Sequence, residues 1–205
     1  LNTLRIGLGT AYRLADDLIL RFNALYDIKN QKASVEAIAP TTPDDRAAIL
    51  RNQQIHHRDE VYRGFSDCSF LISRQCFGVL TDDDHLVVSI GTSIPIGKTE
   101  DDPWKLGNAG QKHLHIQFGS GTFNPLLGLN YSTPVTGRTS VAATAHGSFP
   151  FYENSKTYRH SVELSGRTEV RYRVNAWMAL HVGYSGLVQS YAHWDGEQDK
   201  NSGLI

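Results

Sequence analysis

The sequence predicts an all-β protein, an antiparallel up-and-down transmembrane β-barrel of which about eight strands are present. Three observations predict it. Apolar and polar residues alternate over long segments, the connections between these segments are alternately short and long, and no apolar run is long enough for a membrane-spanning helix. A period of two places every second side chain on one face of a strand, whereas a helix repeats about every 3.6 residues.

The first two segments show the alternation most clearly. Apolar residues occupy most alternate positions from Leu4 to Leu14, and the pattern resumes from Leu18 to Ile28 after Ala15-Asp16-Asp17. So short a connection predicts a β-hairpin. Strands of about 11 residues suit a tilted membrane crossing, whereas strands of soluble proteins usually have about 5 or 6 residues.

Further strands are expected along the rest of the chain. They are Phe65–Arg74, where the alternation is weak, Leu86–Ile96, Leu114–Phe118, Leu127–Tyr131, Val141–Phe151, Tyr158–Arg167 and Ala176–Tyr184. Between the third and fourth of these, Gly119-Ser120-Gly121 predicts a β-bulge or a bend, and the phase change of the apolar residues across it favours the bulge. Aromatic residues near several expected strand ends fit the interfacial girdles of membrane barrels.

The connections alternate in length. Short ones are centred near Ala15, Thr81, Thr136 and Arg173, and longer ones near Pro40, Asp102, Asn154 and Asp195. In an up-and-down barrel this places turns at one rim and loops at the other. We expect residues 1–205 to form a single β-barrel domain that is incomplete at both ends, because the chain starts inside a patterned segment without Met and ends after a polar loop.

Composition excludes some partners and cross-links. The chain has 20 Lys and Arg against 21 Asp and Glu, so no nucleic-acid partner is expected. The expected partners are the lipid bilayer and small solutes. Cys68 and Cys76 would lie too far apart for a disulfide in one extended strand, at about 3.3 Å per residue, so a disulfide would require a bend between them.

Residues 30–60 interrupt the pattern with one long loop. Thr42-Pro43-Asp44-Asp45 followed by an apolar stretch predicts a short capped helix. The connectivity places the loop at the external rim, as a lid or a constriction, and makes it a possible site for a protein partner. Ile49 and Leu50 are expected to contact the barrel or that partner, and His56 and His57 to lie near the mouth.

Four stretches carry a family resemblance. They are Arg63-Gly64-Phe65-Ser66-Asp67, residues 86–97, Gly119-Ser120-Gly121, and Leu127-Gly128-Leu129-Asn130-Tyr131. Together they resemble the bacterial outer-membrane transporter family associated with phenol meta-cleavage pathways, over roughly residues 63–184. The resemblance implies a porin-like β-barrel in the outer membrane with a role in solute passage. This chain departs from outer-membrane barrels in not ending on a strand with a terminal aromatic residue.

The expected function is a passive channel or transporter for small solutes in the bacterial outer membrane, with no cofactor. Polar residues of the inward face would set its selectivity. The candidate pore-lining residues are Arg5, Arg21, Asp27, His113, His115, Glu163 and Arg167. Two alternatives remain open: a structural or adhesive surface barrel without an open pore, and a soluble lipocalin-like ligand-binding barrel.

Three constellations could carry chemistry. His56-His57 beside Asp59 and Glu60 could bind a metal ion, and so could imidazoles at positions 113, 115, 146 and 181 if the barrel gathered them. His146-Gly147-Ser148, with Glu163 as the acid, has a spacing similar to that of outer-membrane lipid A deacylases. That family acts at the lipid-facing surface, whereas His146 and Ser148 lie on the polar face. We therefore expect neither an enzyme nor a metal site.

Overall fold

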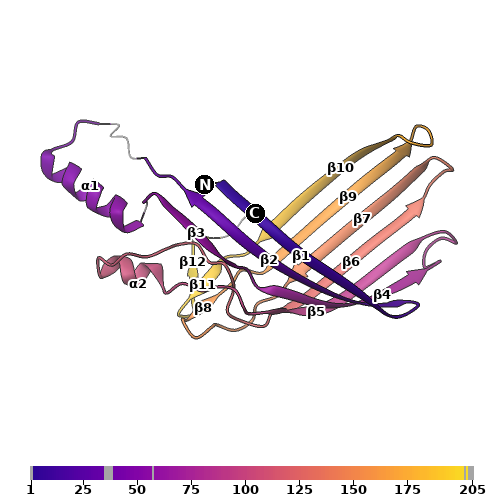
Figure 1. The fold of residues 1–205 in the computed structure, drawn as a ribbon, viewed down its shortest axis with the longest axis horizontal. Helices are drawn as coiled ribbons and strands as arrows, with labels where there is room; N and C mark the ends of the chain where they lie inside the picture. The colour runs from indigo at the N-terminus through magenta and orange to yellow at the C-terminus, as the bar shows by residue number, and fades with distance from the viewer. Residues whose placement is uncertain (1, 35–38, 57, 201, 203–205) are drawn as a thin grey trace.

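One curved antiparallel sheet forms most of the protein (Figure 1). The computed structural model describes residues 2–34, 39–56, 58–200 and 202. The strands follow the order β1-β2-β4-β5-β6-β7-β9-β10, and β3 also pairs with β2. They are β1 (Asn2–Ala15), β2 (Leu18–Gln31), β3 (Glu60–Phe65), β4 (Cys68–Phe77), β5 (His85–Ile94), β6 (Pro125–Pro134), β7 (Thr139–Ser148), β9 (Glu163–Arg173) and β10 (Ala179–Gln189). The predicted all-β, up-and-down architecture is confirmed.

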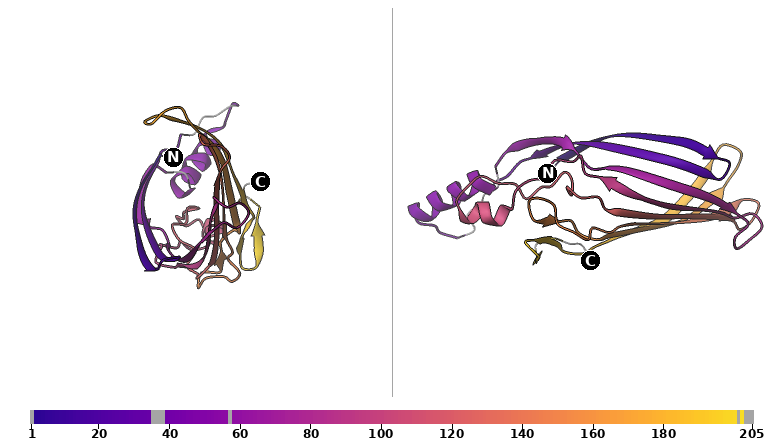
Figure 2. Two further views of the ribbon diagram at one scale, coloured as in Figure 1. Left: turned by 90° about the vertical axis from the view of Figure 1, so that its right-hand side faces the viewer. Right: turned by 90° about the horizontal axis from the view of Figure 1, so that it is seen from below.

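Seen along its long axis, the sheet bends into an open trough (Figure 2). Among the described strands, the outer edges of β1 and β10 pair with no further strand. Short turns join the strands at one end, at residues 16–17, 78–84, 135–138 and 174–178, and we call this end the turn rim. The long connections 32–59, 95–124 and 149–162 lie at the other end, the loop rim. The predicted segregation of turns and loops is therefore confirmed.

The two faces of the sheet differ in polarity. In β4, Ser73 is fully buried while the adjacent Ile72 is 41% exposed, and in β5 Ser89 is 5% exposed while Ile90 is 61% exposed. The buried serines face the inside of the curve, where the Ser73 and Ser89 hydroxyls lie 2.8 Å apart. Polar and charged side chains predominate on the concave face, and exposed apolar side chains predominate on the convex face. In a water-soluble barrel, the apolar side would be expected to face inward.

A bulge separates β3 from β4. Tyr26 of β2 pairs with Phe65, and Asn23 pairs with Ser69. Between these pairs, two residues of β2 lie opposite the three residues that connect β3 to β4. The extra residue leaves Asp67 outside the ladder, facing the interior. Of the bulge or bend predicted at residues 119–121, the bulge is wrong, because these residues lie in a loop before β6 begins, and the bend is confirmed at Gly121. Both cysteines are free, and they occupy one strand, β4.

Two helices and a small sheet lie at the loop rim. The expected capped helix is α1 (Pro43–His56), where the Thr42 hydroxyl accepts a hydrogen bond from the Asp45 N–H. A second helix, α2 (Pro103–Asn108), begins after Asp102, whose carboxylate accepts from the Trp104 N–H. The small sheet contains β8 (Tyr158–Arg159), β11 (Ala192–Trp194) and β12 (Glu197–Asp199). No helix among the described residues has the length and apolarity to cross a membrane.

The predicted strand Phe65–Arg74 is divided between β3 and β4, and two further predicted strands differ more strongly from the structure. Residues 114–118 form no strand, because β5 already pairs with β4 on one side and β6 on the other, which leaves no edge for a strand between them. Tyr158 pairs with Trp194 in the small sheet, and β9 begins only at Glu163. Tyr158 is therefore buried at the loop rim and belongs to no girdle.

A carboxylate fixes the longest turn of the turn rim. Asp84 is buried and accepts hydrogen bonds from the N–H groups of Val79, Leu80 and Thr81 at 2.7, 2.6 and 2.9 Å. Burial alone would raise the pKa of the Asp84 carboxyl, but these three bonds outweigh it and hold that pKa below its ordinary value. The turn is thus organised around an ionised side chain.

Candidate solute pathway

The connection between β5 and β6 folds back against the concave face, and we call residues 95–124 the inner segment. Figure 2 shows part of it within the curve of the sheet, while α2 projects beyond the loop rim. Phe118 packs against Gly64 of β3, where a Cβ atom would lie 3.3 Å from the Phe118 ring. The Lys29 ammonium sits 4.6 Å from the centre of the same ring. The interior is therefore narrowed from the β2–β3 side.

Asp67 anchors the inner segment at both of its ends. One carboxylate oxygen accepts from the Gly97 N–H at 3.0 Å, and the other accepts from the N–H and hydroxyl of Ser120 at 2.7 and 2.6 Å. The two ends pass so closely that a Cβ on Gly119 would lie 2.6 Å from the Gly97 Cα. Only glycine permits this approach. A single carboxylate thus clamps the segment to the bulge between β3 and β4.

The returning end of the inner segment is also bonded to β5. The Ser93 hydroxyl donates to the Thr122 carbonyl at 3.1 Å and accepts from the Asn124 N–H at 2.9 Å. Within the turn, the Thr122 hydroxyl donates to the Asn124 side-chain oxygen at 2.7 Å. All three side chains are buried, so their polar atoms are satisfied by one another instead of by water.

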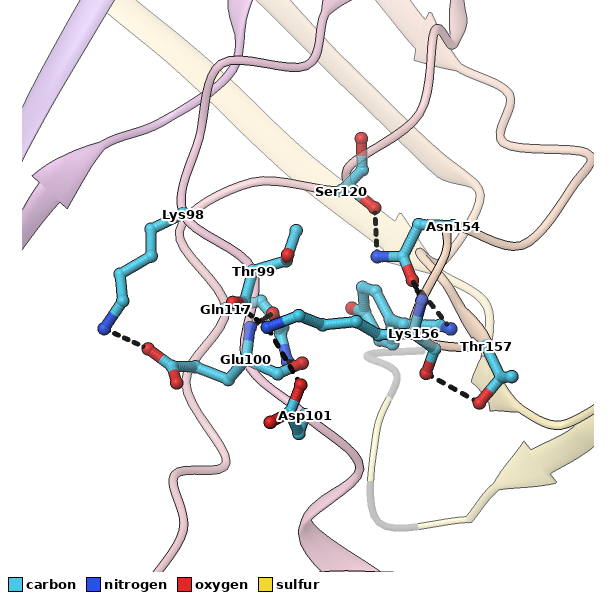
Figure 3. A network of polar contacts seen from close by, with 10 residues as sticks. Lys98, Thr99, Glu100, Asp101, Gln117, Ser120, Asn154, Lys156 and Thr157 are labelled. Atoms are coloured by element: carbon cyan, nitrogen blue, oxygen red, sulfur yellow. Dashed lines mark hydrogen bonds and ion pairs between the residues drawn. The ribbon is translucent and has the colours of Figure 1, made fainter.

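A second polar network joins the inner segment to the loop after β7 (Figure 3). The Lys156 ammonium donates to the Thr99 carbonyl at 2.8 Å and pairs with the Asp101 carboxylate at 2.9 Å. The Asn154 side chain donates to the Ser120 carbonyl at 2.9 Å. The inner segment is therefore held from the β3–β4 side by Asp67 and from the β7–β9 side by these two residues.

Ion pairs extend this network to α2. Lys105 of α2 pairs with Asp195, which lies between β11 and β12. The hydrogen bond between them raises the pKa of the Lys105 ammonium and lowers the pKa of the Asp195 carboxyl. The Glu100 N–H donates to the side-chain oxygen of Gln117 at 2.8 Å, and the Gln117 side-chain amide donates to the Glu100 carbonyl at 3.3 Å. The loop rim is thus a connected polar structure.

A cavity of about 270 Å³ remains between the inner segment and the concave face. Its wall includes Arg5, Ser148 and Glu163 from the sheet, Gln117 from the inner segment, and His160 from the connection before β9. Hydroxyl, amide and charged groups dominate this wall, so it offers hydrogen-bonding partners to a small polar molecule.

Five of the sequence-predicted pore-lining residues lie on the concave face. Arg5 and Asp27 form a bidentate pair, with Nε to Oδ1 at 2.7 Å and Nη2 to Oδ2 at 2.9 Å. Asp27 is fully buried and also accepts from the Ser66 hydroxyl at 3.2 Å. Arg21 lies on this face two residues closer to the turn rim than Asn23. Glu163 and Arg167 occupy alternate positions of β9 on the same face.

The remaining two predicted residues, His113 and His115, belong to the inner segment and not to a strand. Their rings pack edge to face with centres 5.1 Å apart, and the His115 ring meets Trp104 of α2. The Arg58 guanidinium donates to the His113 carbonyl at 3.3 Å. The prediction that they line the interior from a strand face is therefore wrong, because the segment that carries them is not part of the sheet.

The other described histidines of the predicted constellations are not gathered into one site. His146 lies on β7 and His181 on β10, where its Nδ1 is 2.8 Å from Glu169 Oε1. Within the described part of the chain, no group of His, Cys, Asp and Glu side chains has metal-binding geometry. His56 ends α1, and His57 lies outside the described residues. Ser148 pairs in register with Glu163, and the Glu163 carboxylate accepts from Gln189 at 2.7 Å.

The long loop 32–59 lies beyond the strand ends at the loop rim. Viewed along the axis, α1 falls within the outline of the trough (Figure 2). Leu50 is 56% exposed, and its expected contact with the barrel or a partner stays a prediction. Ile49 is half-buried. Sequence reasoning placed the constriction in this loop and missed the inner segment, although Gly97 and Gly119 mark the close approach of its two ends.

These features define the class of fold: an antiparallel half-barrel with an apolar outside and a polar inside. It resembles the crystal structure of an outer membrane channel from Pseudomonas putida F1, with a TM-score of 0.56 and 15% sequence identity. The match covers 95% of this chain and 63% of that channel. No protein-family model and no curated protein matches the sequence. At this identity the likeness shows the fold.

Proposed function

We propose that the chain forms the larger part of a passive channel for small solutes in the bacterial outer membrane, without a cofactor or enzymatic activity. The observation that carries the proposal is the separation of the two faces of one sheet. Long strands present exposed apolar side chains on the convex face and buried serines with charged residues on the concave face. An apolar surface of this extent suits a bilayer, and the polar side suits a water-filled passage.

The inner segment would set the width of this passage. It crosses the loop-rim end of the concave face, and Asp67 on one side and Lys156 on the other hold it there. Solutes would pass the adjoining cavity, whose wall offers hydrogen bonds from several strands. The link to phenol meta-cleavage pathways that the sequence resemblance implies belongs to this proposal as well, as does binding of a protein partner at α1.

One observation favours a second function, that of a structural surface barrel without an open pore. The inner segment is bonded on both sides, and such a segment could close the interior altogether. Eight-stranded barrels are known to fill their interior with side chains. The two functions make opposite predictions for ion conductance.

The complete channel protein, reconstituted in a planar lipid bilayer, is expected to give discrete current steps in symmetric potassium chloride. Insertion would be checked separately, by protection from protease and by slower gel migration of the unheated protein. Inserted, folded protein that stays electrically silent over many trials would contradict the channel and favour the structural barrel. A protein that remains monodisperse without detergent would contradict both.

A further inference from the structure

The charges on the concave face are unevenly paired. The acidic side chains of its strands already have partners: Asp27 is bonded by Arg5, and the two carboxylate oxygens of Glu169 are contacted by Arg167 at 2.5 Å and by His181 at 2.8 Å. Glu163 accepts from Gln189. The acidic groups of this face are therefore largely neutralised or hydrogen-bonded.

Several arginines of the same face have no such partner. Among the described residues, Arg13, Arg21 and Arg171 make no ion pair, and each lies in the half of its strand that is nearer the turn rim. Arg13 and Arg171 are exposed, and Arg21 is half-buried. The positive charge of the interior is thus concentrated toward one opening.

Three arginines meet in a pocket of about 220 Å³ at that opening. Arg171 and Arg173 come from the end of β9, and Arg138 from the turn between β6 and β7. The Arg173 guanidinium donates to the Gly137 carbonyl at 2.6 Å, and its backbone N–H donates to the Arg138 carbonyl at 2.8 Å. These bonds hold the turn against β9, and all three arginines line the one pocket.

No carboxylate lines this pocket, and hydroxyl groups complete its wall. Thr136, Thr139 and Ser140 are the hydroxyl residues of the lining. The neighbouring cavity does contain acidic groups, Asp83 and the already bonded Glu169. Like charges held together raise the local potential, and a planar guanidinium matches the oxygens of carboxylate and phosphate. A small oxyanion is the ligand that this arrangement suits.

We propose that this turn-rim arginine pocket binds small carboxylate- or phosphate-bearing solutes, and that it makes the channel prefer anions. The proposal rests on the proposed channel function and adds the class of solute. Arg171 and Arg173 carry the preference, because they face the interior at the opening. Arg74 lies at the same rim on the convex face, paired with Asp17 at 3.0 Å, and it contributes nothing to the preference.

Reversal potentials across bilayers of zwitterionic lipid, in a gradient of potassium chloride, test the preference. The complete protein is expected to pass chloride more readily than potassium, and its Arg171→Gln/Arg173→Gln variant to lose that preference several-fold. The Arg74→Gln control should keep it. Inorganic phosphate should reduce the chloride current of the wild type and of the control, but not that of the double variant. Equal permeability of the two ions in the wild type, or an equal phosphate response in the double variant, would overturn the proposal.

A binding measurement in detergent separates this proposal from the channel function, because it needs no current. Inorganic pyrophosphate is expected to raise the unfolding temperature of the wild type and of Arg74→Gln, and to leave that of the double variant unchanged. A silent bilayer with a preserved pyrophosphate effect would contradict the channel and support the anion site. Stabilisation by phosphatidylglycerol in the micelle, without any by pyrophosphate, would make the pocket a lipid-headgroup site and overturn the solute assignment.

Discussion

Replacing Asp67 with alanine is expected to release the inner segment and raise the conductance of the channel. The substitution removes the acceptor of three hydrogen bonds, from the Gly97 N–H and from the N–H and hydroxyl of Ser120. Leaving such donors without their acceptor costs on the order of 3 kcal/mol, which corresponds to about a hundredfold shift toward the released segment. Single-channel recordings would measure the change as larger or noisier current steps.

Two variants control this experiment. Asp67→Asn keeps the size of the side chain and one acceptor oxygen, so its conductance should lie between those of the wild type and Asp67→Ala. Asp82→Ala removes the same charge from an exposed position in the turn-rim loop and should leave the conductance unchanged. Wild-type conductance in a folded, inserted Asp67→Ala protein would show that the inner segment does not limit passage.

Replacing Gly91 with alanine is expected to destabilise the sheet strongly. Gly91 pairs with Leu71 of β4 at a position where a Cβ atom would lie 1.9 Å from the Phe70 carbonyl oxygen. Backbone occupies this space, so no side-chain rotation relieves the overlap, and β4 must move away from β5. Overpacking costs about 1–3 kcal/mol in well-packed sites, and we expect a loss at or above the upper value. Urea unfolding in detergent would measure it.

Gly166→Ala is the matched control, because Gly166 also lies within a strand. The nearest atom to its Cβ position is the Thr144 carbonyl oxygen at 3.6 Å, an ordinary contact. This variant should be as stable as the wild type or slightly more so, since glycine in a strand costs about 0.5–1 kcal/mol relative to alanine. Equal midpoints for both variants would mean that β4 and β5 are not as closely apposed as the structure has them.

The strands that could be predicted from the sequence are those whose two faces meet different surroundings. In β1, β2 and β5 most convex-face side chains are apolar and most concave-face side chains are small, polar or charged, and this produces the alternation. The apolar exceptions on the concave face are Ile19, Leu25 and Val87. The same physical cause explains why Arg5, Asp27 and Glu163 were assigned to the correct face. The alternation of short and long connections likewise predicted the two rims.

The inner segment could not be predicted in this way. From Leu114 to Phe118, apolar and polar residues alternate as they do in a strand. Such alternation indicates that the two sides of a segment have different surroundings, but it does not indicate whether another strand is available for pairing. Here Phe118 is buried against Gly64, and His113 is buried at the loop rim. The contacts that position the segment join Asp67 to Ser120, residues 53 positions apart in the chain. A pattern confined to neighbouring residues does not contain such a contact.

The most direct test of the central claim compares two adjacent positions of β10 in lipid vesicles. Tyr184 is on the convex face, where it is 77% exposed, and Ser185 is also exposed but lies on the concave face in register with Arg167. With Cys68 and Cys76 replaced by alanine, Tyr184→Cys and Ser185→Cys would each be treated with a membrane-impermeant thiol reagent. If the convex face meets lipid and the concave face meets water, Ser185→Cys reacts quickly and Tyr184→Cys is protected. Fast reaction at both positions, or protection of Ser185→Cys alone, would contradict the claim.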